Sequence, residues 1–201
     1  MSKRPQFCKS FASLVLVLSG TLFSCATVDG KAEIKPSGSL ELLAELQPGD
    51  IVVAPVRNQT GNDSVPLDEL RLGLAKAAIG RMYNPLDLAY VDKNWVESSF
   101  KGSPAPDGML VMAVTGWDAT HLYSNGNVSI EAELLLFEGA STTGAALWGM
   151  EISHTVNMSG GKDGAPAPSP LLIPEAAMRL AEHALATLPM RDPMLAHEPN
   201  S

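Results

Sequence analysis

The stretch from Asn127 to Glu138 constrains the fold of this chain more than any other feature, because apolar and polar residues alternate along it. Successive side chains of a strand point to opposite faces of a sheet, so this period of two predicts a strand with one dry and one wet face. The segment from Ala145 to Val156 alternates in the same way, and Gly139 to Gly144 between them is predicted as a hairpin loop. The predicted inward residues are Val128, Ile130, Ala132, Leu134, Leu136, Trp148, Met150 and Ile152.

A third strand is predicted just before this hairpin. Gly108 to Thr115 is almost continuously apolar, which is typical of a strand that is covered on both faces in the middle of a sheet. Ser124, Asn125 and Gly126 then supply residues that favour a turn. The sequence therefore predicts three consecutive antiparallel strands.

The first part of the chain predicts a strand followed by a helix. Asp50 to Val56 is a short β-branched run after Pro48 and Gly49, which is typical of a buried strand. Arg57 to Ser64 is polar and predicts a loop. Pro66 to Met82 places leucines and alanines along one helical face, and Ser64 is a candidate N-cap for this helix.

The remaining elements complete the predicted order. Leu88 to Val91 is predicted as a second strand, and Asp92 as the N-cap of a helix over Lys93 to Phe100. Pro174 to Leu188 predicts a last amphipathic helix. The order β-α-β-α-β-β-β-α predicts an α+β fold in which helices pack on one face of a single mixed sheet.

The N-terminus carries the pattern of an export signal. Phe11 to Ser24 is an uncharged apolar run of 14 residues, preceded by Lys3, Arg4 and Lys9 without an acidic residue. A membrane-spanning helix needs roughly 20 residues, so this run is too short to span and is predicted to be removed as a signal peptide.

The end of this segment resembles the lipobox of bacterial lipoproteins. Leu22, Phe23, Ser24 and Cys25 match the order of Leu, any residue, a small residue and Cys. The resemblance implies cleavage before Cys25 and lipid attachment to its thiol, which would make the chain a membrane-anchored lipoprotein. Ala26 in place of Asp implies the outer membrane by the same resemblance. An ordinary signal peptide that contains a cysteine is the alternative.

Removing residues 1–24 takes three positive charges from a chain of net charge −8, so the remaining 177 residues carry −11. An acidic surface argues against nucleic acid or anionic lipid as a partner, because both need positive charge. We expect a lipidated N-terminus and tether at 25–48, one α+β domain at 49–190 and a flexible tail at 191–201. The cysteine usage predicts no disulfide, because Cys8 lies in the removed segment.

The sequence offers no recognised catalytic, cofactor or metal motif. It contains no G-x-S-x-G, P-loop, G-x-G-x-x-G or H-E-x-x-H pattern, which favours a protein that is not an enzyme. Glu131 and Glu133 are expected to be the solvated side of a strand rather than an acid–base pair. None of the histidines has a second histidine or cysteine nearby in sequence, so no metal site is expected, although His121 or His154 at a sheet rim has a functional alternative.

Several segments resemble a family of bacterial periplasmic lipoproteins of the Neisseria genome-derived antigen type. The matching residues are Pro55, Asn58 and Thr60, the strand from Asp107 to Trp117, and the hairpin from Leu134 to Trp148. Relatives of this family in fold include the N-terminal domain of TolB, the lipoprotein activators of penicillin-binding proteins, and the lipoproteins of curli and Pel polysaccharide export. The resemblance covers roughly residues 50–156.

The resemblance implies a non-catalytic outer-membrane lipoprotein, facing the periplasm, that binds proteins of an envelope assembly, secretion or export system. Two alternatives remain: an activator of a cell-wall synthase, or a small periplasmic hydrolase with an unrecognised site. Self-association through a sheet edge or the last helix is a further possibility. The candidate partner contacts are Asn58, Thr60, Trp117, Asp118 and His121, although Trp117 at a sheet edge is also typical of a core aromatic.

Overall fold

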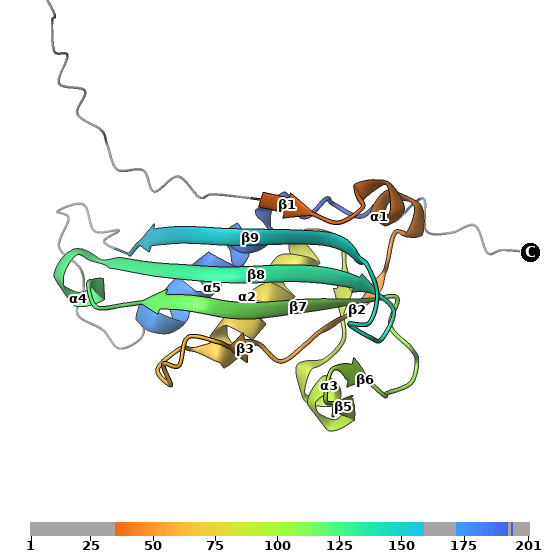
Figure 1. The fold of residues 1–201 in the computed structure, drawn as a ribbon, viewed down its shortest axis with the longest axis horizontal. Helices are drawn as coiled ribbons and strands as arrows, with labels where there is room; N and C mark the ends of the chain where they lie inside the picture. Colours follow the sequence, from red (N-terminus) through yellow and green to blue (C-terminus); the bar gives the residue numbers. More distant parts are fainter. Residues whose placement is uncertain (1–34, 159–171, 193, 195–201) are drawn as a thin grey trace, which may run out of the picture.

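Three long antiparallel strands form the centre of the sheet in the computed structural model, which describes residues 35–158, 172–192 and 194. They are β7 (Gly108–Asp118), β8 (Asn127–Glu138) and β9 (Ala146–Asn157). The strand order is β1-β9-β8-β7-β2-β4, with β3 also paired to β7 (Figure 1). The short helix α4 (Leu122–Asn125) joins β7 to β8. The predicted antiparallel strands and the middle position of Gly108 to Thr115 are confirmed.

The alternation in β8 and β9 decides which face of the sheet is dry. All eight residues predicted to point inward are buried, while Glu131, Glu133 and Glu151 are exposed on the opposite face. Leu110, Leu136 and Trp148 stand in register across the three strands and belong to the main core. Burial of each such side chain stabilises the fold by about 1.5–3 kcal/mol, so the pattern fixes the register of the strands.

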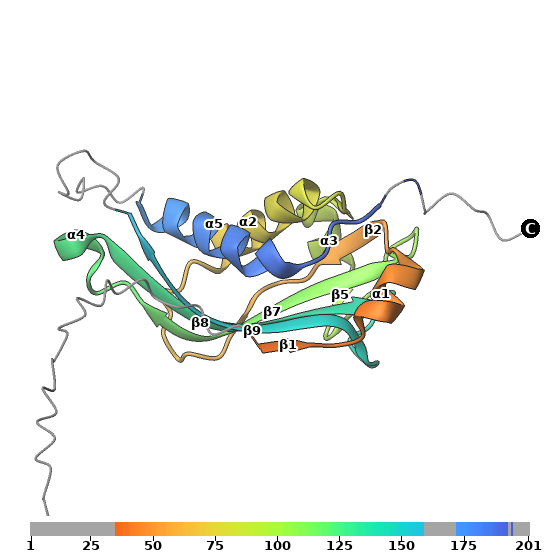
Figure 2. The ribbon, with the colours of Figure 1, turned by 90° about the horizontal axis from the view of Figure 1, so that it is seen from above.

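Two helices cover the dry face, α2 (Leu67–Gly80) and α5 (Leu172–Ala184), the latter followed by the 3-10 turn η1 (Leu185–Thr187). Figure 2 shows both helices on one side of a sheet that curves around them. Gly73 allows the close approach of the helices, because a Cβ there would lie 2.8 Å from the Cβ of Ala181. The two helices are predicted correctly. Ser64 is not the N-cap of α2, since that position is Pro66 and the Ser64 hydroxyl instead bonds to Asn62.

Parallel strands extend one side of the sheet and make it mixed. β2 (Asp50–Val53) pairs in parallel with β7 and with β4 (Asn84–Pro85), and β3 (Arg57–Asn58) pairs in parallel with β7 further along. The predicted fold class, an α+β fold with helices packed on a mixed sheet, is confirmed.

The prediction for residues 88–100 is wrong. Leu88–Asn94 forms helix α3, not a strand, because the Asp87 carboxylate accepts a hydrogen bond from the Tyr90 N–H and caps it. Residues 95–100 form the hairpin of β5 (Trp95–Val96) and β6 (Ser99–Phe100) instead of a helix. In the structure, the strand that follows α2 along the chain is the two-residue β4, which takes the place of the strand predicted at Leu88 to Val91. A run of four apolar residues fits either a helix turn or a strand, so periodicity alone could not decide.

Among the described residues, the other face of the sheet is covered near β2. Val91 of α3 and Phe100 of β6 pack there against Val52, Met109 and Val111 in a second, smaller apolar cluster. The rest of this face, along β7, β8 and β9, carries Thr115, Glu131, Glu133, Glu151 and Ser153, all exposed. We call this region the open face.

Ordered structure extends beyond the predicted domain limits at both ends. β1 (Lys35–Ser37), which pairs with β9, and α1 (Leu40–Leu46) lie within the segment predicted as a tether. Arg191 donates to the Gln47 carbonyl, and the Asp192 N–H donates to the Gln47 side chain. The predicted signal peptide and Cys25 lie outside the described residues. No helix in the described part of the chain is long and apolar enough to cross a membrane.

Candidate functional site

The polar loop after β3 is held by its own side chains. The Asn58 Oδ1 accepts from the N–H of Thr60 at 3.0 Å and from its hydroxyl at 2.7 Å, while the Asn58 Nδ2 donates to the Asn62 carbonyl at 2.8 Å. Asn62 repeats the arrangement with Ser64. Such turns rigidify a loop and fix which groups it presents. Asn58 therefore shapes this surface as well as being exposed on it.

The end of β7 holds the other predicted contact residues. Trp117 is half-buried against the main core, so its ring contributes to packing as well as to the surface. The Asp118 Oδ1 accepts from the Thr120 hydroxyl at 2.6 Å and from its N–H at 2.8 Å, and these bonds hold the pKa of Asp118 below its ordinary value. His121 is exposed immediately before α4.

The structure brings these two regions to the same side of the sheet. Asn58 stands beside Val114 in the parallel pairing of β3 with β7, and the Gln59 N–H donates to the Val114 carbonyl at 2.8 Å. Trp117 follows Val114 by three residues, a distance of about 10 Å along a strand. We call the surface of Asn58, Thr60, Trp117, Asp118 and His121 the β7 rim.

The open face next to this rim is acidic and shallowly hollowed. A hollow of about 310 Å³ is lined by Glu131, Glu133 and Glu151 among others, and one of about 330 Å³ continues from it past Trp117. Gly116 leaves room for the Glu131 side chain, since a Cβ there would lie 3.0 Å from the Glu131 Oε2. Glu133 and Glu151 stand directly opposite each other across β8 and β9, a like-charged pair that the sequence analysis did not single out. The face carries negative charge on two neighbouring strands, β8 and β9.

Two histidines that are far apart in sequence meet in the structure, a contact that the sequence did not predict. The ring centroids of His154 in β9 and His183 in α5 are 4.5 Å apart. His154 occupies an even position of its strand, which points its side chain toward the helices. The alternation of the strand therefore indicated on which face His154 lies, although not which residue it meets there. Burial, and then the charge of His183, lower the pKa of His154.

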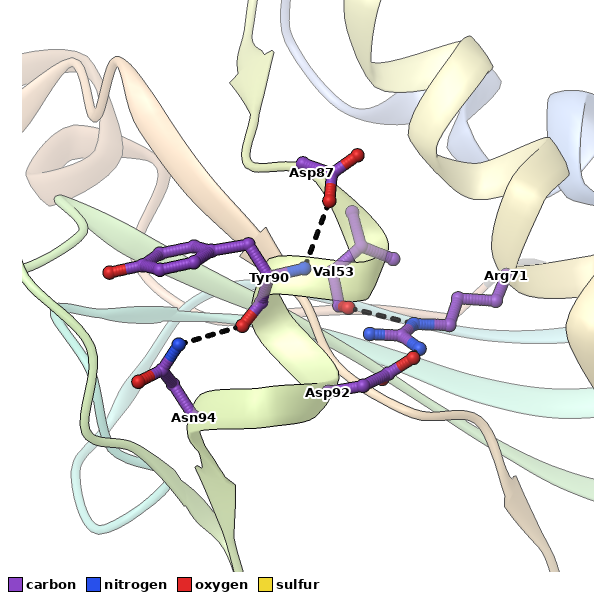
Figure 3. A network of polar contacts seen from close by, with 6 residues as sticks. All are labelled: Val53, Arg71, Asp87, Tyr90, Asp92 and Asn94. Atoms are coloured by element: carbon purple, nitrogen blue, oxygen red, sulfur yellow. Dashed lines mark hydrogen bonds and ion pairs between the residues drawn. The ribbon is translucent and has the colours of Figure 1, made fainter.

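A buried arginine that the sequence analysis missed ties three elements together (Figure 3). Arg71 of α2 is 6% exposed; its Nε donates to the Val53 carbonyl at 3.0 Å, and its Nη1 pairs with Asp92 at 2.5 Å. Asp92 was predicted as a helix cap and instead lies inside α3 as the partner of this charge. The network fastens α3 to α2 and β2. Sequence periodicity gave no signal, because Arg is usually exposed on a helix.

Within the residues that the structure describes, no group of three or more His, Cys, Asp or Glu side chains is arranged to hold a metal ion. The predicted lipid attachment site, Cys25, lies outside these residues and stays a prediction.

No protein-family model matches the chain, and no curated protein matches its sequence. Its fold is similar to that of PelC from Paraburkholderia phytofirmans, a dodecamer, with a TM-score of 0.52 and 13% identity over 80% of this chain and 99% of the PelC chain. A second structure of a PelC variant matches with a TM-score of 0.50. Lipoprotein GNA1162 from Neisseria meningitidis is 14% identical, with a TM-score of 0.43 over 68% of this chain and 97% of that one. At these identities the likeness to PelC shows a shared fold.

Proposed function

We propose that this protein is a non-catalytic, lipid-anchored accessory of a bacterial envelope export system, and that it works as a ring of identical copies. The observation that carries the proposal is the fold shared with the PelC dodecamer over 99% of the PelC chain. The lipobox at Leu22 to Cys25 adds the anchor, and the resemblance to export lipoproteins adds the outer membrane and the periplasmic side.

The edges of the sheet support self-association. β1 pairs with β9 only as far as Glu151, and no described strand pairs with Ile152 to Val156 on that side. On the opposite side, β3 pairs with β7 only as far as Val114, which leaves Thr115 to Asp118 without a described strand partner there. Unpaired strand edges readily add a strand from another chain.

These two edges lie at the same end of the sheet, on opposite sides. A contact between the β9 edge of one copy and the β7 edge of the next joins two different surfaces, and such head-to-tail contacts close into rings when the rotation permits. The β7 rim would then receive the β9 edge of the neighbouring copy. This assigns Asn58, Thr60, Trp117, Asp118 and His121 to a contact between copies.

The anchor would strengthen a weak contact of this kind. Copies held in one leaflet meet at a high effective concentration, so the interface needs little intrinsic affinity. A lipid with two or more acyl chains gives stable attachment, at about 0.8 kcal/mol for each buried methylene. The net charge of −11 on the remaining chain would keep the copies away from anionic headgroups, so attachment depends on the lipid.

Assembly is tested with the chain lacking residues 1–24 and with the full lipoprotein in detergent, by light scattering after size exclusion. We expect a ring in detergent, and we expect Ser153→Lys with Thr155→Lys to reduce it to monomers, because charges on an edge strand oppose pairing. The matched control is Ser129→Lys, which places the charge on the same face of the neighbouring central strand β8. A wild-type monomer in detergent, or equal dissociation by edge and control variants, would overturn the assembly part.

Anchoring is tested in a Gram-negative bacterium that expresses the full chain. We expect incorporation of labelled palmitate and fractionation with the outer membrane, and loss of both in Cys25→Ser. A soluble wild-type protein without label contradicts the anchor. Cross-linking in the same cells, followed by mass spectrometry, tests the export role, because capture of cell-wall synthases alone would favour the synthase-activator alternative.

A further inference from the structure

The contact between His154 and His183 joins the sheet to the last helix. The two rings lie with centroids 4.5 Å apart and planes tilted by 36°. The Nδ1 of His154 is buried and has no hydrogen-bond partner among the residues that the structure describes. An imidazole that accepts a proton becomes a donor at both nitrogens, so a charged His154 would leave a buried N–H without an acceptor. The geometry therefore favours a neutral His154.

The neighbour makes charging still less favourable. His183 is exposed and lies in the last turn of α5, where the helix dipole favours a positive charge. When His183 carries a proton, His154 would take up its own proton beside a cation.

Among the described residues, the other groups that face His154 offer its charge little compensation. From β8, the residue directly opposite is Ile130, which is buried and apolar. On α5, Arg179 lies one turn before His183 and pairs with Glu175 at 2.7 Å, and Glu182 beside His183 is exposed. On β9, Glu151 occupies an odd position on the open face, opposite to the side of His154. His183 is the neighbour whose charge acts on His154.

We propose that His154 and His183 form a pH-sensitive latch that holds the C-terminal half of α5 on β9 when both rings are neutral and loosens it when both are charged. The pKa of His154 is lowered in the folded state, so the unfolded or opened state binds the proton more readily. The latch therefore stabilises the contact above the ordinary histidine pKa of 6.5, and this stabilisation is lost as the pH falls through the pKa of the folded state.

The segment that the latch controls covers the main core. This segment of α5 and η1 contributes four buried side chains to the core, those of Leu180, Ala184, Leu185 and Leu188. Loosening this segment in acid would expose an apolar surface next to the edge of β9. This inference does not rest on the proposed function, since every readout below follows the histidines and the amides of α5 and η1 directly, in the chain lacking residues 1–24.

The test is NMR titration of the histidines, with amide exchange of α5 and η1 at about pH 5 and about pH 7.5, all in the presence of a chelator. We expect the pKa of His154 to lie below 6.5 in the wild type and to rise in His183→Gln. Each pKa unit between folded and opened states corresponds to a tenfold change in opening. After correction for intrinsic exchange, we expect opening of Leu180 to Leu188 to increase severalfold on acidification in the wild type, and clearly less in His183→Gln.

The matched control is His121→Gln, which removes an exposed histidine without a ring contact to any described residue and should leave both measurements unchanged. His154→Phe is the second variant, since it keeps an aromatic ring in the contact and should abolish the pH dependence. An unchanged His154 pKa in His183→Gln overturns the latch. So does an α5 exchange rate whose pH dependence survives in both His183→Gln and His154→Phe.

Discussion

The three-stranded meander of β7, β8 and β9 and the flank beside it are stabilised differently. The flank consists of β2 and β4, which belong to the same sheet as the meander, together with α3 and the separate β5–β6 hairpin. The meander has strands of 11 or 12 residues, joined by hairpins and paired along almost their whole length. The flank has strands of two to four residues (Figure 1). Its elements depend on contacts between residues that are distant in sequence.

Polar side chains make many of these distant contacts. The Asp107 Oδ2 accepts from the N–H groups of Gly49 and Asp50 at 2.9 and 3.0 Å, at the point where β2 begins. The Asn84 side chain donates to the Asp50 carboxylate at 2.6 Å, and Arg71 joins α2 to α3. Burial of apolar side chains therefore stabilises the meander, whereas the flank also depends on specific hydrogen bonds and charges.

The largest effect is expected from Leu134→Ala in the meander. Leu134 is 0% exposed in the main core, and removing such a side chain costs about 2–5 kcal/mol of the free energy of unfolding through lost burial and the cavity left behind. Denaturant unfolding measures the loss. Leu72→Ala is the matched control, because Leu72 is 41% exposed on α2 and should cost much less. Equal losses at both positions would contradict the packing described for the meander.

A smaller and more local effect is expected from Asp92→Asn in the flank. The change leaves the Arg71 charge buried beside a neutral partner, and hydrogen bonds to charged groups contribute about 1.5–3 kcal/mol. The side chain of Asp92 is 56% exposed, so solvent screening reduces the expected loss to about 1 kcal/mol. Amide exchange should show the loss mainly in α3.

Asp63→Asn is the control for this change, because Asp63 is exposed in the polar loop and its loss of charge should be silent. Adding Arg71→Met to Asp92→Asn should recover part of the stability, since no buried charge then remains. A double variant less stable than Asp92→Asn alone would show that Arg71 stabilises the flank mainly through its bond to Val53.

The stability of the flank at alkaline pH is expected to depend on the ionisation of Tyr83. Burial raises the pKa of Tyr83 to about 12, while the nearby charges of Arg191 and Arg81 act in the opposite direction, and its hydroxyl donates to the Pro189 carbonyl at 3.1 Å. The folded state therefore holds this proton more tightly than the unfolded state, whose value is near 10.0. The contribution of Tyr83 to the free energy of unfolding is fully present below pH 10.0 and falls as the pH rises toward about 12.

We expect Tyr83→Phe to lose about 0.5–1.5 kcal/mol at neutral pH, the contribution of one hydrogen bond, and to show a shallower decline in stability above pH 10.0. Denaturant unfolding at a series of pH values measures both quantities. Tyr123→Phe, at an exposed tyrosine of α4, is the control and should keep the wild-type decline. An identical alkaline slope in Tyr83→Phe would contradict the assigned protonation.

The meander could be predicted from the sequence because the order of apolar and polar residues within each strand indicates its buried face. The positions of Val128 to Leu136 and of Trp148 to Ile152 determine the buried face without reference to the rest of the chain. Leu88 to Val91 contains no such information, because four apolar residues fit a strand or a helix. The outcome there depends on the cap at Asp87 and on the distant Arg71.

The candidate site was also predicted only in part. The sequence indicated Asn58 and Trp117 separately, but the pairing of β3 with β7 that brings them to one rim is a tertiary contact. It indicated His154 and His183 as isolated residues, because a strand and a helix about thirty positions apart give no joint periodicity. Whether the β7 rim contacts a partner, and whether Cys25 carries lipid, remain predictions of the sequence.

The smallest effect is expected at Asp118, where the meander ends in a polar turn. The Thr120 hydroxyl is the main cause of the low pKa of Asp118, ahead of the Thr120 N–H and the charge of His121. Thr120→Val should raise the pKa of Asp118 toward its ordinary 3.8 in an NMR titration, and Thr120→Ser, which keeps a hydroxyl, should leave it low. We expect no measurable change in unfolding, because Asp118 is exposed and the strands before it are stabilised by apolar burial. A clear loss of stability in Thr120→Val but not in Thr120→Ser would mean that the meander, like the flank, depends on a specific polar contact, and the distinction between the two regions would fail.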